Sequence, residues 1–133
     1  IIAELPSRIA SSKILFVGLR NWERKEIIVR QKQYGIPHLA PKDVAQNSDA
    51  VKCWLKTCGA SKVLIHFDMD VLDPSEIVAA VGTDPEGMKM EEVIRVINDI
   101  AVEKEIVGLT IAEPMPRTAI RIKDMLNRLP LLK

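Results

Sequence analysis

Residues 62–74 of this chain read KVLIHFDMDVLDP, and this stretch decides the fold. Its first part is a short run rich in Val, Leu and Ile, which favours a buried β-strand over an amphipathic helix. Because residues two apart on a strand share a face, we expect His66, Asp68 and Asp70 to line up where the strand leaves the core. Burying two carboxylates side by side is costly unless a positive charge compensates them. The stretch therefore predicts part of a divalent-metal site.

The rest of the chain alternates apolar runs with amphipathic segments, and Gly and Pro residues separate them. Strands that are apolar throughout and alternate with helices predict an α/β fold whose parallel sheet is covered by helices on both faces. We expect strands over residues 13–18, 36–39, 63–67 and 106–112, with a long loop over residues 73–87. We expect helices over residues 24–34, 90–104 and 118–129, and one that begins at Asp43 or Ser48 and ends near Cys58.

Polar residues follow these expected strands. In open α/β sheets, ligands bind outside the carboxyl ends of the strands. Arg20 follows the first strand, the aspartates follow the third and Glu113 follows the fourth. Prolines occupy positions 114 and 116, and because proline cannot continue a sheet interior, the chain must turn there. We therefore expect Glu113 to lie beside the aspartates.

Composition narrows the function classes. The chain has 133 residues, which is enough for one domain with a core. Its 19 basic and 18 acidic residues give a net charge of +1, so charge gives no reason to expect nucleic acid or a membrane surface as a partner. No apolar run is long enough to span a bilayer. Without a signal peptide ahead of them, Cys53 and Cys58 indicate reduced thiols in a cytoplasmic protein.

Residues 67–74 (FDMDVLDP) resemble the F-D-x-D-x-x-D-P signature of the ureohydrolases, which include arginase, agmatinase and formimidoylglutamase. Residues 17–20 (VGLR), Gly82-Thr83 and residues 111–113 (IAE) resemble further motifs of the family, in the same order. The resemblance covers nearly the whole chain, but only the C-terminal half of a ureohydrolase. It implies that residues 1–133 are the C-terminal portion of a single arginase-like domain, with a three-layer α/β/α fold and a mainly parallel sheet.

The resemblance also implies a chemistry. Ureohydrolases hydrolyse guanidino or formimino C–N bonds with a hydroxide that bridges two Mn²⁺ ions, and they commonly assemble as homotrimers or homohexamers. By this resemblance, Asp68 and Asp70 would be metal ligands and Asp73 would brace the loop. Glu113 would accept hydrogen bonds from the planar guanidinium of the substrate. Oxygen ligands of this kind suit Mn²⁺ or Mg²⁺.

The chain departs from the family pattern in its metal ligands. The upstream G-G-D-H and D-A-H-x-D motifs are absent, and the only histidines are His38 and His66. The chain also begins with Ile rather than Met, so we expect a fragment that is inactive alone. Asn21 and Glu23 stand where arginases carry acids that hold the α-amino group of arginine. The substrate therefore stays open among arginine, agmatine, formiminoglutamate and related compounds.

Other interpretations remain open at this stage. Residues 65–70 (IHFDMD) also resemble the first motif of haloacid-dehalogenase-type phosphatases, in which Asp68 would be the nucleophile, Asp70 the general acid and Mg²⁺ the metal. A third possibility is a scaffold of the arginase fold without activity. The aspartates could simply cap the strand end, and Glu113 could satisfy turn amides. His66 could be a ligand or a hydrogen-bonded core residue, and His38 is expected to be a loop residue at the carboxyl end of the second strand.

Overall fold

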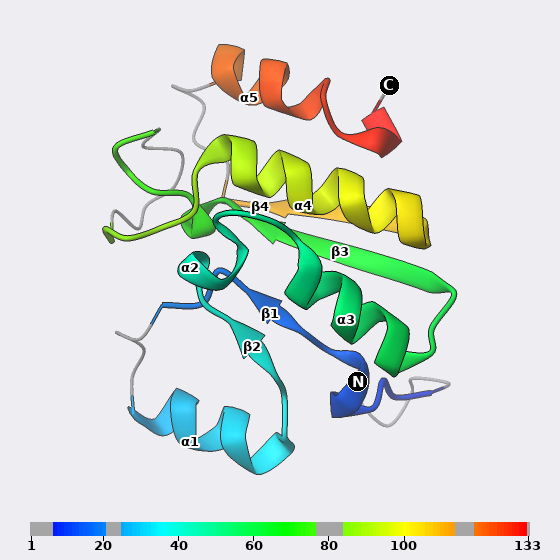
Figure 1. Ribbon diagram of the computed structural model, residues 1–133. Coiled ribbons are helices and arrows are strands. Elements are labelled where there is room, and N and C mark those ends of the chain that lie inside the picture. Colours follow the sequence, from blue (N-terminus) through cyan, green and yellow to red (C-terminus); the bar gives the residue numbers. More distant parts are fainter. Residues whose placement is uncertain (1–6, 21–24, 77–83, 114–118, 133) are drawn as a thin grey trace.

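The computed structural model describes residues 7–20, 25–76, 84–113 and 119–132 (Figure 1). Its strands form two parallel pairs, and all of them point toward the same end of the molecule (Figure 1). Parallel pairing of α/β type is therefore confirmed, although the described strands form two pairs rather than one continuous sheet. The first pair is β1 (Phe16–Val17) with β2 (His38–Leu39), and the second is β3 (Lys62–Asp68) with β4 (Glu105–Ala112).

The helices follow the expected alternation. Of the two starts expected for the helix that ends near Cys58, Ser48 is confirmed, because it occupies the N-cap position of a helix that begins at Asp49. The start at Asp43 is wrong, because Asp43 lies in a separate short helix. The helix after Ser48 ends at Gly59, which has a left-handed backbone with a φ of 67°. The helices are α1 (Lys25–Tyr34), α2 (Pro41–Val44), α3 (Asp49–Cys58), α4 (Met90–Glu103) and α5 (Ala119–Leu126).

The core lies between the β3–β4 pair and the helices α3 and α4, which cover one face of this pair (Figure 1). Helix α4 contributes the residues that its 3/4 spacing predicts. In this partial domain, Leu64 on β3 is 63 % exposed. The best-buried side chains of the core include Val51, Leu55, Phe67, Met69, Val93, Ile94, Ile97 and Ile100.

The end of β1 brings the two strand pairs together. Gly18 donates its backbone N–H to Leu39 O over 2.8 Å and has a φ of +85°. A Cβ at this position would lie 2.2 Å from Cγ2 of Val71 and 2.9 Å from Sδ of Met88. The chain after β1 therefore packs directly on the turn that follows β3, and only glycine fits there.

No helix in the described part of the chain is long and apolar enough to cross a membrane. Both cysteines are free thiols; Cys53 is exposed and Cys58 is buried. The expected reduced state of the cysteines agrees with this arrangement.

Candidate metal centre

The carboxyl end of β3 presents two aspartates. The strand ends at Asp68, and the chain enters a 3₁₀ turn over Met69–Val71. Met69 is only 1 % exposed and anchors this turn in the core, whereas the aspartates on either side of it are partly exposed. The backbone N–H of Asp70 donates to Oδ1 of Asp68 over 3.1 Å. Asp68 thus caps the turn, and this cap holds the two residues together.

Glu113 joins the aspartates from the neighbouring strand. Parallel pairing places Asp68 beside Ala112, so Glu113 leaves β4 at the point where β3 ends. Glu113 has a φ of 57°, an uncommon left-handed conformation for a residue with a side chain. One carboxylate oxygen each from Asp68, Asp70 and Glu113 lies within 4.8 Å of the other two. The expectation that Glu113 lies beside the aspartates is confirmed.

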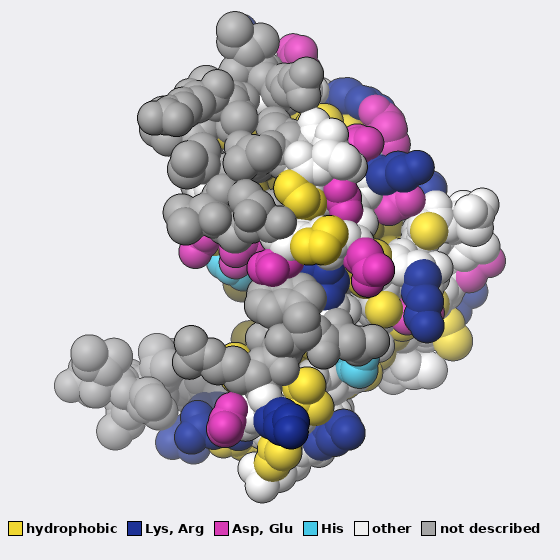
Figure 2. Space-filling view, turned by 90° about the vertical axis from the view of Figure 1, so that its left-hand side faces the viewer, with side chains coloured by type: hydrophobic (Ala, Val, Ile, Leu, Met, Phe, Trp, Pro, Cys, Tyr) yellow, Lys and Arg dark blue, Asp and Glu magenta, His cyan; other side chains and the backbone are white. Residues whose placement is uncertain are grey.

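This carboxylate cluster has the donors that a hard divalent cation requires. Like charges this close repel one another unless a cation lies among them. Oδ1 of Asp70 is buried and has no hydrogen-bond partner among the described residues, an arrangement that is costly for a carboxylate without a positive neighbour. Oxygen-only donors suit Mg²⁺, Ca²⁺ or Mn²⁺. Figure 2 looks onto this end of the molecule, where acidic side chains gather.

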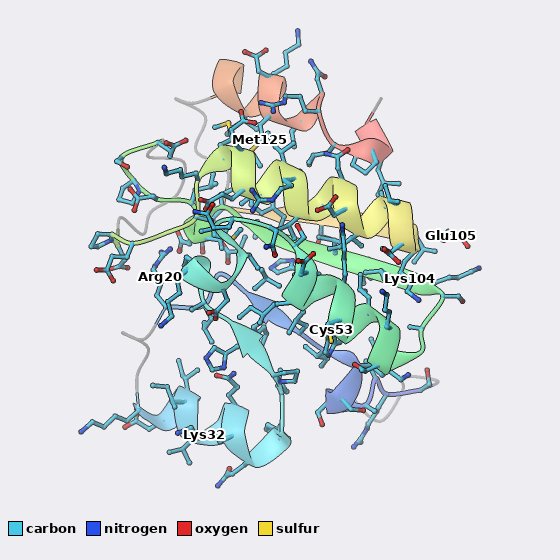
Figure 3. All side chains as sticks on the ribbon, viewed as in Figure 1. Arg20, Lys32, Cys53, Lys104, Glu105 and Met125 are labelled. Atoms are coloured by element: carbon cyan, nitrogen blue, oxygen red, sulfur yellow. The ribbon has the colours of Figure 1, made fainter. Side chains whose placement is uncertain are left out.

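Arg20 contacts the same turn from the other strand pair. Its Nη2 donates to the backbone oxygen of Asp70 over 2.6 Å, and its Nη1 donates to that of Val71 over 3.2 Å. Figure 3 labels Arg20 at the strand ends. The sequence predicts that Arg20 follows a strand, but it indicates no contact for its side chain. Its partners lie 50 and 51 positions away, so no local pattern in the sequence could have identified them.

Asp73 braces the loop that follows the turn, which confirms the role implied by the resemblance. Its Oδ1 accepts the backbone N–H of Ser75 over 2.9 Å as well as the Ser75 hydroxyl, and its Oδ2 accepts the N–H of Gly87 over 3.0 Å. These hydrogen bonds, with the Ser75 hydroxyl foremost, hold the pKa of the Asp73 carboxyl below its ordinary value. A Cβ on Gly87 would lie 2.7 Å from Leu72 O, so glycine is required for this close approach.

Each histidine hydrogen-bonds a residue outside the carboxylate cluster. His66 shares a 2.8 Å hydrogen bond between its Nδ1 and the hydroxyl of Thr110 on β4, and it is exposed. Among the described residues, the group that could hold a metal ion does not include His66. His38 shares a 2.9 Å hydrogen bond with Gln31 and belongs to β2 rather than to a loop. Asn21, Glu23 and Gly82-Thr83 lie outside the described residues.

The chain was compared with known protein families and structures. The arginase family model matches residues 2–126. An arginase of Eremothecium gossypii is 26% identical over 123 residues, which is 89% of this chain and 31% of that protein. The structure of Entamoeba histolytica arginase in complex with L-ornithine superposes with a TM-score of 0.79 at 20% identity, over 96% of this chain and 46% of that one. Bacillus subtilis formimidoylglutamase superposes with a TM-score of 0.72 at 20% identity, over 80% and 35%.

These matches favour the ureohydrolase interpretation over the phosphatase alternative. The structural neighbours confirm the arginase-like α/β fold. The chain spans less than half the length of these relatives, so it corresponds to part of their domain. With the family model matched over nearly all of its residues, this chain belongs to the arginase family.

Proposed function

We propose that this chain is part of a Mn²⁺-dependent ureohydrolase that hydrolyses a guanidino or formimino C–N bond. One observation carries the proposal: carboxylate oxygens of Asp68, Asp70 and Glu113, from two neighbouring strand ends, lie within 4.8 Å of one another. The named relatives support the reaction class, because they include an arginase and a formimidoylglutamase.

In this proposal, Asp68 and Asp70 are ligands of two Mn²⁺ ions. A bound divalent ion supplies a water nucleophile at neutral pH by lowering the pKa of that water. The residues of this chain keep the ligands in place. The Asp70 N–H holds the Asp68 carboxylate, and the orphaned Oδ1 of Asp70 is available to a cation.

Glu113 is the proposed substrate contact. A carboxylate pairs with the planar fork of N–H donors that a guanidinium presents, and such charge-assisted pairs fix orientation as well as affinity. The left-handed backbone at Glu113 directs the chain out of β4 beside the aspartates. A guanidino group held by Glu113 therefore lies next to the metal ligands. Hydrolysis adds water to the guanidino carbon, breaks one C–N bond and releases urea and an amine; a formimino substrate releases formamide.

The remaining parts of the proposal concern the complete protein. Two ions require more ligands than the cluster offers within the described residues. We propose that further ligands come from outside this chain and that the chain alone is inactive. We propose a homotrimer or homohexamer, by likeness to the family, and a cytoplasmic location, for which the free thiols are the support. The substrate is a small guanidino or formimino compound.

Calorimetric titration with Mn²⁺ tests this proposal. It is carried out on this chain and on the full gene product that contains it, followed by assays for urea or formamide release with arginine, agmatine and formiminoglutamate. We expect tight binding of two ions and hydrolysis in the full product only. Absence of Mn²⁺ binding in both would refute the proposal and favour a scaffold without activity. Mg²⁺ binding with phosphatase turnover would favour the phosphatase alternative.

A further inference from the structure

Arg20 donates hydrogen bonds to the turn that carries Asp70 of the carboxylate cluster. Its guanidinium reaches across from the end of β1 and donates to two consecutive backbone oxygens, those of Asp70 and Val71. Hydrogen bonds from a charged donor are stronger than those from a neutral one, and two parallel donors fix the geometry of their acceptors. The fork therefore restrains the peptide units that lie next to the Asp70 side chain.

Further contacts hold the same turn at Val71. Val71 Cγ2 fills the space that the missing Cβ of Gly18 leaves, and the Val71 oxygen also accepts the backbone N–H of Met88 over 2.8 Å. Among the described residues, no strand pairing joins β1 to β3. The Arg20 fork and the Gly18 packing both hold the β1 end against the metal-ligand turn.

From this arrangement we propose that Arg20 is a positioning residue that sets the metal affinity of the site. It fixes the backbone of Asp70 so that the Asp70 N–H meets the Asp68 carboxylate and the Asp70 carboxylate faces its neighbours in the cluster. The inference rests on the proposed function, because it presumes that Asp68 and Asp70 bind a metal.

The chain offers a matched control for this role. Arg95 on α4 likewise donates from its guanidinium to two consecutive backbone oxygens, those of Val44 and Ala45. Both arginines are half-buried, but the partners of Arg95 belong to the end of α2 and not to the turn that carries Asp70. In Arg95 a single nitrogen, Nη2, donates both hydrogen bonds. Replacing Arg95 therefore removes a guanidinium contact to two backbone oxygens without changing a partner of the metal-ligand turn.

The test measures Mn²⁺ affinity by calorimetry and the thermal midpoint without metal for Arg20→Met, Arg20→Lys and Arg95→Met, each in the full gene product. Loss of one hydrogen bond from a charged donor changes an equilibrium constant by about tenfold or more. We expect about 100-fold weaker Mn²⁺ binding in Arg20→Met and about tenfold weaker binding in Arg20→Lys, which keeps the charge but not the fork. Arg95→Met should lower the midpoint while its Mn²⁺ affinity stays at the wild-type value.

Each outcome bears on the inference. Wild-type Mn²⁺ affinity in a folded Arg20→Met protein would overturn it, as would an equal loss of affinity in Arg95→Met. If Arg20→Met does not fold, Arg20→Lys decides, and unchanged affinity in that variant overturns the fork's role. If the wild-type protein does not bind Mn²⁺, both the proposed function and this inference are overturned. If the wild-type protein binds Mn²⁺ and the Arg20 variants bind it equally well, only this inference is overturned.

Discussion

Replacing Gly18 with Ala tests the contact between the β1 end and the metal-ligand turn. The new Cβ would lie 2.2 Å from Val71 Cγ2, a distance at which something must move. The backbone at Gly18 also has a φ of +85°, which residues with a side chain adopt at a cost. The substitution therefore combines two separate penalties, and each can be measured.

The magnitudes follow from the two causes. A left-handed conformation costs a residue with a side chain about 1 kcal/mol. Forcing an extra carbon into a packed region costs about 1–3 kcal/mol more. We therefore expect Gly18→Ala to lower the free energy of unfolding by about 2–4 kcal/mol. Gly59→Ala provides the matched control, because Gly59 has a φ of +67° and no atom within 4 Å of an added Cβ, so it should lose only about 1 kcal/mol.

Urea unfolding followed by circular dichroism measures these differences at constant m-value. The double variant Gly18→Ala/Val71→Ala separates the clash with Val71 from the remaining costs, because the shortened side chain at position 71 lacks the colliding carbon. We expect its loss of stability to be smaller than the sum of the two single losses by at least about 1 kcal/mol. Equal costs for Gly18→Ala and Gly59→Ala, or strict additivity in the double variant, would refute the close contact.

Further predictions concern the carboxylates in the full gene product. Asp68→Ala and Asp70→Ala should each abolish Mn²⁺-dependent urea or amide release while the circular dichroism spectrum stays unchanged; retained activity in either variant contradicts its ligand role. Glu113→Gln should reduce turnover with guanidino substrates by about 10–100-fold at unchanged Mn²⁺ content, and lost Mn²⁺ would make Glu113 a ligand instead. The pKa of Asp73 is lower in the folded chain than in the unfolded one, so its contribution to stability is complete above about pH 4–5 and is lost as the pH falls through the folded value. The stability difference between wild type and Asp73→Asn should accordingly shrink from about pH 6 to about pH 3, and a constant difference would contradict this.

The elements that local patterns determine were predicted well. The apolar run of β3 and the 3/4 spacing of α4 are properties of consecutive residues, and both elements lie within a residue of their expected ends. The run over residues 13–18 gave a strand of only two residues, because strand length depends on the partner, and β2 pairs along Phe16–Val17 alone. Of the two starts expected for the helix up to Cys58, the sequence could not decide between Asp43 and Ser48; the helix begins after Ser48, where the side chain of Asn47 accepts the backbone N–H of Asp49 over 3.0 Å.

In the candidate site, too, some contacts could be predicted from the sequence and others could not. The meeting of Glu113 with the aspartates could be predicted, because carboxyl ends of parallel strands share one edge of a sheet. The Arg20 fork could not, because its acceptors are backbone oxygens, which every residue carries and which leave no mark in the sequence. The brace at Asp73 lies between these cases. Its Ser75 partner is local, but the Gly87 amide returns from 14 positions away.

The contacts around the turn explain how like charges can be held together. Backbone groups fix the turn: Arg20 holds its oxygens, Met88 N–H donates to Val71 O, and Asp73 N–H donates to Met88 O over 2.8 Å. None of these hydrogen bonds involves a carboxylate of the cluster; the one that does is the cap from the Asp70 N–H to the Asp68 carboxylate. Two unit charges about 5 Å apart repel by about 1 kcal/mol in water and by more in a less polar surrounding. The contacts of the turn hold the carboxylates close together despite this repulsion. A cation can therefore bind to ligands that are already in place, and no free energy is spent on bringing them together.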